Sequence, residues 1–177
     1  MKTWKVIIFL LLALNAVWFA LGPSPSKALD ACAWLALLAL FVWEAECGDR
    51  LAAGRGRLIL RSARLVAAIG VIAAMVGYVF EDNALDTVNS VVWIAIVIVL
   101  EAQLRAPAFA ARMRHALTAT ALLLYGTLGV LVVLWAREGL WMDAYDAVLW
   151  LTAFATLELA ITRRSAAAAN GAAISAG

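Results

Sequence analysis

Long apolar runs recur along the chain and are separated by short stretches that contain charged residues, glycine or proline. An α-helix of about 20 apolar residues is long enough to cross a hydrocarbon core of about 30 Å. Six runs come near this length: residues 4–21, 28–47, 58–80, 85–104, 113–136 and 143–162. The pattern therefore predicts an all-α polytopic membrane protein with six transmembrane helices.

The connections between the runs are too short to fold on their own. Residues 1–164 are therefore expected to form one transmembrane bundle of three hairpins, 4–47, 58–104 and 113–162. The stretch 165–177 is low in complexity and rich in Ala, Ser and Gly, which predicts a disordered cytoplasmic tail. Lys2 and Lys5 before the apolar stretch from Val6 to Leu14 also suit a signal peptide, but the apolar residues continue to Leu21, which favours a retained helix.

Composition supports the membrane prediction. Hydrophobic residues make up 66% of the 177 positions and charged residues 15%, whereas soluble domains average about 45 to 50% and about 25%. This balance excludes a soluble enzyme, a nucleic-acid-binding module and a small disulfide-stapled domain. The lipid bilayer is the first expected partner.

Basic residues are distributed unevenly between the two predicted sides of the bundle. Of the fourteen Lys and Arg residues, only Lys27 and Arg137 fall on one side. Because basic loops stay in the cytoplasm, both termini are predicted to be cytoplasmic, in the inner (plasma) membrane. The basic face could also contact anionic lipid head groups, although topology alone explains its charge.

The predicted helices contain a repeat. In the fourth and sixth runs Trp follows Asp by seven residues and Glu follows Trp by eight, as in Asp86, Trp93 and Glu101 and in Asp143, Trp150 and Glu158. The second run is a looser copy, with Asp30, Trp34 and Glu44. We therefore expect the hairpins to be three copies of one unit.

The repeated glutamates, Glu44, Glu101 and Glu158, are the first candidates for function. A carboxylate within a membrane helix is costly, and a ring of three near one mouth would attract cations or pass protons. The structural alternative is ion pairing at the inner interface. Arg105, for example, follows Glu101 at the helical spacing that favours a pair.

A second acidic group, Asp30, Asp86 and Asp143, lies at the predicted outer ends, with Asp146 and Asn89 nearby. Near a helix start, Asp commonly accepts hydrogen bonds from free backbone N–H groups and complements the helix dipole. The functional alternative is a rim that collects cations.

Some uncharged residues are candidates for packing or for contact with a ligand. Trp93 and Trp150 occupy equivalent positions of the repeat, and Asn15 and Asn89 are amides within apolar runs. Packing and interhelical hydrogen bonds are the favoured interpretation. Trp135, near the end of its run, is expected to be an interfacial belt residue.

The chain offers little for catalysis. With one histidine, His115, and two cysteines, Cys32 and Cys47, a zinc site or bis-histidine haem is not expected. No lysine is predicted to lie in the middle of a span, so a retinal Schiff base is not expected either. The sequence predicts no enzyme activity, no metal and no cofactor.

The sequence favours a cation or proton channel or transporter with acidic residues at both mouths. The alternative is a non-catalytic accessory or scaffold subunit that packs against a larger membrane complex or against copies of itself. An enzyme that acts on a lipid or quinone is a weaker third interpretation.

Overall fold

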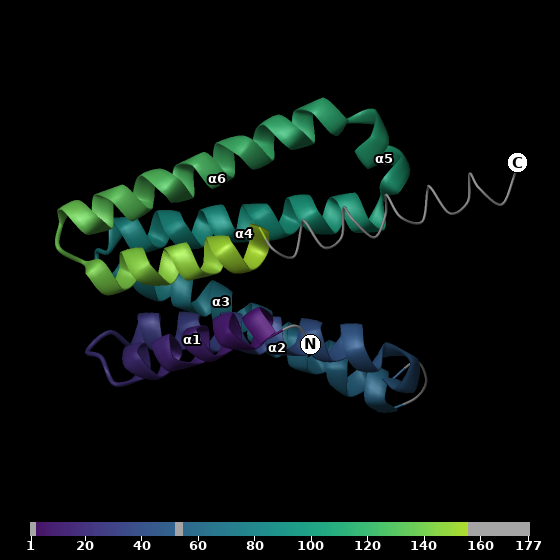
Figure 1. The fold of residues 1–177 in the computed structure, drawn as a ribbon, viewed down its shortest axis with the longest axis horizontal. Coiled ribbons are helices and arrows are strands. Elements are labelled where there is room, and N and C mark those ends of the chain that lie inside the picture. The colour runs from purple at the N-terminus through teal and green to yellow at the C-terminus, as the bar shows by residue number, and fades with distance from the viewer. Residues whose placement is uncertain (1–2, 52–54, 156–177) are drawn as a thin grey trace, which may run out of the picture.

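The computed structural model describes residues 3–51 and 55–155, which form seven helices joined by short turns (Figure 1). Six of them are α1 (Thr3–Ala20), α2 (Pro25–Leu51), α3 (Arg55–Phe80), α4 (Ala84–Arg105), α5 (Pro107–Arg112) and α6 (Arg114–Arg137). The seventh is the helix over residues 141–155, called here the 141–155 helix. The predicted tail, 165–177, and the end of the sixth predicted span lie outside the described residues.

Within the described residues, four helices are long and apolar enough to cross a membrane: Pro25–Glu44, Gly56–Phe80, Ala84–Gln103 and Arg114–Arg137. The apolar part of α1, Val6–Ala20, is shorter. The helical class and the apolar character of these helices are therefore as predicted. Six spans and cytoplasmic termini stay predictions.

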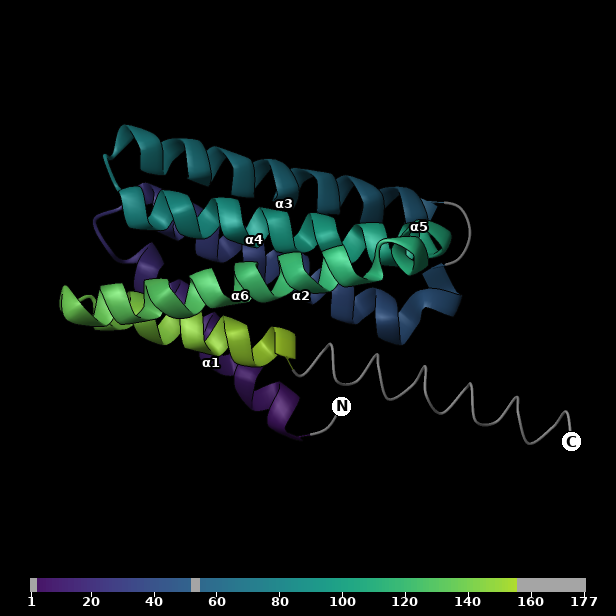
Figure 2. The same ribbon diagram turned by 90° about the horizontal axis from the view of Figure 1, so that it is seen from above.

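Three tight connections, residues 21–24, 81–83 and 138–140, lie at the same end of the bundle (Figures 1 and 2). Two of them share one capping geometry. The N–H of Asn83 bonds to the carbonyl of Tyr78 at 3.0 Å, and the N–H of Leu140 bonds to that of Trp135 at 2.8 Å. A left-handed residue precedes each of these donors, Asp82 in one turn and a glycine in the other, as the Schellman motif requires.

Two local features differ from the sequence-based expectation. Helix α2 begins at Pro25, three residues before the predicted span, so Lys27 lies in its first turn and not in a loop. The predicted inner loop after α4 contains a short helix, α5, which starts at Pro107 because proline is well suited to the first helical position.

A cluster of buried apolar residues joins α1, α4, α6 and the 141–155 helix. Its members include Leu12, Ile96, Leu128, Leu131 and Ala153. Large apolar side chains also face outward. Leu122 and Leu123 of α6, for example, are 69% and 73% exposed. A surface of this kind is compatible with contact to a lipid bilayer, where apolar side chains are in their preferred solvent.

Candidate functional site

A pocket lined by charged, polar and aromatic residues lies toward the end of the bundle that holds the three tight turns, and its empty space, open solvent at the mouth included, is about 550 Å³. Its walls come from α1, α2, α3, α4, α6 and the 141–155 helix. The pocket therefore lies where helices from all three predicted hairpins meet.

Twelve of the fourteen lining residues form four sets of three with one spacing. In each set the second residue follows the first by 59 positions, and the third follows the second by 57. The sets are Lys27, Asp86 and Asp143; Asp30, Asn89 and Asp146; Trp34, Trp93 and Trp150; and Phe19, Tyr78 and Trp135. Each predicted hairpin thus contributes one residue to every set.

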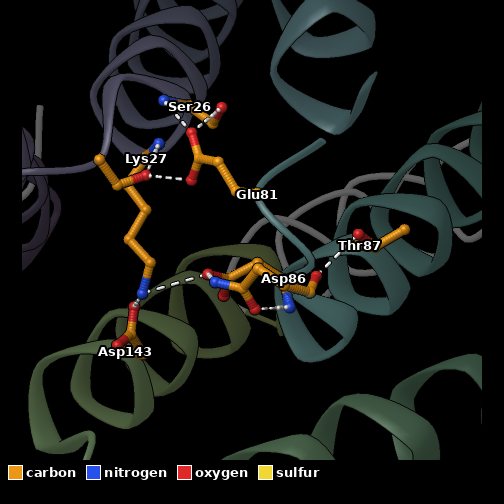
Figure 3. Close-up of polar contacts among 8 residues, drawn as sticks. Ser26, Lys27, Glu81, Asp86, Thr87 and Asp143 are labelled. Carbon is orange, nitrogen blue, oxygen red and sulfur yellow. Dashed lines mark hydrogen bonds and ion pairs between the residues drawn. The ribbon is translucent and has the colours of Figure 1, made fainter. Parts of the chain in front are cut away.

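The first set, here the outer layer, is an ammonium group held between two carboxylates. Lys27 of α2 reaches across the bundle so that its Nζ lies 2.5 Å from Asp143 Oδ1 and 3.1 Å from Asp86 Oδ2 (Figure 3). The Phe19 ring centroid is 5.8 Å from the same nitrogen. Two carboxylates and an aromatic face therefore surround one primary ammonium.

Helix α4 is capped by Asn83, not by Asp86. The Asn83 side chain accepts a hydrogen bond from the backbone N–H of Asp86 at 3.2 Å and donates one to the Asp86 carboxylate at 2.5 Å. Because the cap is supplied by a neighbour, the buried Asp86 carboxylate is free to face Lys27. The capping interpretation therefore does not account for this residue.

The second set, here the middle layer, comes three residues further along each helix, about 4.5 Å deeper. Asp146 accepts a hydrogen bond from Asn15 Nδ2 at 2.6 Å, and Asn15 itself is only 3% exposed. The Oδ1 atoms of Asp30, Asn89 and Asn15 are buried without a hydrogen-bond partner. All three are acceptors, so what they can bind is a donor or a cation.

The third set forms an aromatic floor beneath the carboxyl groups. The ring centroids of Trp34, Trp93 and Trp150 are 6.2, 6.2 and 6.4 Å apart in pairs, with interplanar angles of 57° to 64°. Phe154 packs below, 4.8 Å from the Trp93 ring. Tilted and edge-to-face contacts at these distances are favourable for aromatic rings.

Hydrogen bonds connect the mouth of the pocket to the turn between α3 and α4. Glu81 accepts hydrogen bonds from the hydroxyl groups of Ser26, at 2.6 Å, and Ser24, at 2.7 Å (Figure 3). These hydrogen bonds lower the pKa of Glu81 below its ordinary value, because they stabilise the ionised carboxylate. Glu81 thereby fixes the start of α2, next to Lys27.

The structure brings together the outer acidic candidates in the pocket, and of the described inner candidates neither Glu44 nor Glu101 lines it. Asp30, Asp86 and Asp143 all line the pocket. Glu44 forms an ion pair with Arg64 on α3, and Glu101 is exposed on α4. Glu158 lies outside the described residues. Within residues 3–51 and 55–155, no group of three metal-ligating side chains is arranged to hold a metal ion.

Comparison with protein families, curated proteins and solved structures gives no match. The chemistry of the pocket therefore has to be argued from its own residues.

Sequence reasoning missed several residues of the pocket. Lys27 was placed in a loop, Trp135 was expected at the membrane interface, and Phe19 and Tyr78 were not singled out. Trp135 is instead 2% exposed and lines the pocket. The signal for Lys27 was its register, since it precedes Trp34 by the seven residues that separate Asp86 from Trp93.

Proposed function

We propose that this chain is a small integral protein of the inner membrane that transports a cation or a proton, with the pocket as its binding site. The observation that carries the proposal is the convergence of four carboxyl groups and one ammonium on a pocket within an apolar helical bundle. Ionisable groups at such positions are costly, and they commonly mark substrate or ion pathways.

The balance of charge in the pocket favours a cation. With all groups ionised, Asp30, Asp86, Asp143 and Asp146 contribute −4 and Lys27 contributes +1, so the net charge of the pocket reaches −3 at most. A positive ligand reduces the repulsion among these carboxylates, whereas an anion increases it.

The aromatic floor favours a carrier over an open pore. Below the middle layer, Trp34, Trp93 and Trp150 contact one another, and among the described residues none deeper in the bundle than these rings lines the pocket. A cation that crosses the bundle therefore requires these helices to move apart, as in alternating access. Glu44, Glu101 and Glu158 are assigned to the inner mouth in this proposal.

The test is flux in proteoliposomes, measured for protons and for monovalent cations with purified protein. Asp30→Asn and Asp146→Asn should each lower the flux by about tenfold or more, since each removes a charge that faces the ligand. Asp82→Asn is the matched control. It removes a carboxylate of the nearby turn outside the pocket, and Asn also tolerates the left-handed conformation of that residue. Absence of flux in the wild-type protein would reject transport.

The accessory or scaffold alternative is favoured by a different observation. Gly126 and Gly129 on α6 have no neighbouring atoms within 4 Å of an added Cβ. Glycines often allow close approach of a second membrane helix. In that case Gly129→Leu should abolish co-purification with a partner or with a second copy. Neither the wild-type protein nor this variant should then show cation flux.

A further inference from the structure

The outer layer shows how this bundle binds an ammonium ion, because it already binds one of its own. Lys27 Nζ has two carboxylate partners and lies 5.8 Å from the centroid of an aromatic ring. Charge-assisted hydrogen bonds and the negative face of a ring are the interactions that hold alkylammonium ions in proteins.

The middle layer repeats this chemistry without a lysine. It offers the carboxyl groups of Asp30 and Asp146 and the amide of Asn89, with the Trp rings about one helical turn deeper. Each position of this layer corresponds by spacing to a position of the outer layer, but none of its side chains is cationic. The set is therefore matched to a positive charge that the chain does not supply.

The unpartnered acceptors point independently to the same layer. Asp30 Oδ1 and Asn89 Oδ1 are buried without a partner, as is the Oδ1 of Asn15, whose amide nitrogen already bonds to Asp146. Buried acceptors normally have a donor. Asp30 and Asn89 both line the pocket, so their unpartnered oxygens suit a ligand with several N–H groups, such as an ammonium ion.

A bare metal ion suits this layer less well. The described residues contain no group of three His, Cys, Asp or Glu side chains arranged around a metal position. The floor of Trp34, Trp93 and Trp150 provides aromatic rings and no further oxygen ligands on that side. Hard metal ions prefer a shell of oxygen atoms, whereas an organic ammonium gains from aromatic rings.

We propose that the pocket binds a small organic ammonium ion, with its charged nitrogen in the layer of Asp30, Asn89 and Asp146 and its carbon atoms against Trp34, Trp93 and Trp150. This inference rests on the proposed function only where it concerns transport of the bound ion. Binding itself is a separate property. The size of the ion is limited because the Lys27 layer lies directly above the site.

The test is binding of methylammonium chloride to the purified full-length protein in detergent, followed by isothermal titration and by tryptophan fluorescence. We expect a saturable signal that sodium chloride and potassium chloride at the same ionic strength do not produce. Tetramethylammonium serves as the probe of size.

Single substitutions test whether methylammonium binds in the middle layer. Asp146→Asn retains an oxygen for the Asn15 hydrogen bond, so it should fold and should weaken methylammonium binding about tenfold or more. Asp30→Asn is the second variant and should behave similarly. Asp82→Asn, in the turn outside the pocket, should bind within about twofold of wild type, as expected for a surface charge.

Each outcome decides between the two proposals. Equal responses to sodium, potassium and methylammonium, or a response to pH alone, would overturn the ammonium site. Proton or metal-ion flux without methylammonium binding would reject the ammonium site and leave transport standing. Methylammonium binding without any flux would reject transport and leave the ammonium site standing.

Discussion

Lys27 is the residue on which the outer layer depends. At the corresponding positions of the other two predicted hairpins stand Asp86 and Asp143, and both carboxylates contact its ammonium group. Without that positive charge, the two acids would face each other inside an apolar bundle. A single cation therefore makes an acidic layer compatible with folding.

Replacement of this cation should destabilise the protein. Lys27→Met leaves two largely buried carboxylates unpaired, and we expect a loss of about 1–3 kcal/mol, less than for a fully buried pair because the Lys27 side chain is 18% exposed. Thermal unfolding in detergent measures the effect.

The matched control is Arg64→Met, which breaks the more exposed Glu44–Arg64 pair. It should cost no more than about 1 kcal/mol. Similar losses in the two variants would contradict the importance given to the outer layer.

At the scale of the helices, close contact between α2 and α3 positions the mouth of the pocket. An added Cβ at Gly70 would lie 3.2 Å from the Ala33 Cβ, and at Gly77 it would overlap the hydroxyl of Ser26. That hydroxyl also bonds to Glu81 in the α3–α4 turn. Gly77 therefore allows α2 to lie where Lys27 can reach across the bundle.

A pair of alanine substitutions tests this packing. Gly77→Ala should lower stability by about 1–3 kcal/mol, because the added methyl group displaces Ser26 and strains the contact. Gly129→Ala, on the open face of α6, should leave stability unchanged or raise it by up to about 1 kcal/mol, as helix propensity predicts. Equal melting temperatures for the two variants would contradict the packing argument.

At the scale of the whole molecule, the helices alternate in direction and place the turns 81–83 and 138–140 opposite α5 (Figures 1 and 2). The distribution of basic residues predicts that the α5 end is cytoplasmic. The pocket then lies toward the outer side of the membrane.

Labelling of single cysteines tests this orientation. In a protein that lacks Cys32 and Cys47, Glu138→Cys should react with a membrane-impermeant maleimide in intact cells, since Glu138 is exposed in the outer turn. Ala111→Cys, exposed on α5, should react only after the membrane is permeabilised. The reverse pattern would show the opposite orientation.

The helices and their apolar character could be predicted from sequence, because about 20 consecutive apolar residues leave few alternatives to a membrane helix. The pocket could be predicted only in part. The repeated Asp and Trp residues indicated equivalent positions, but their convergence depends on how the helices rotate against one another. The position of Lys27 was predicted wrongly because α2 begins at Pro25, three residues earlier than expected. Lys27 therefore lies in the helix and not in a loop.

The pocket is lined by sets of three residues that are equivalently spaced along one chain. Three identical hairpins around an axis would have to present the same residue three times in every layer, so a layer would be all acidic or all basic. When the hairpins are joined in one chain, each position can change by itself. One set of pocket residues contains a lysine and two aspartates, and the next set contains an asparagine and two aspartates. Covalent linkage thus allows three equivalently spaced positions to carry different charges.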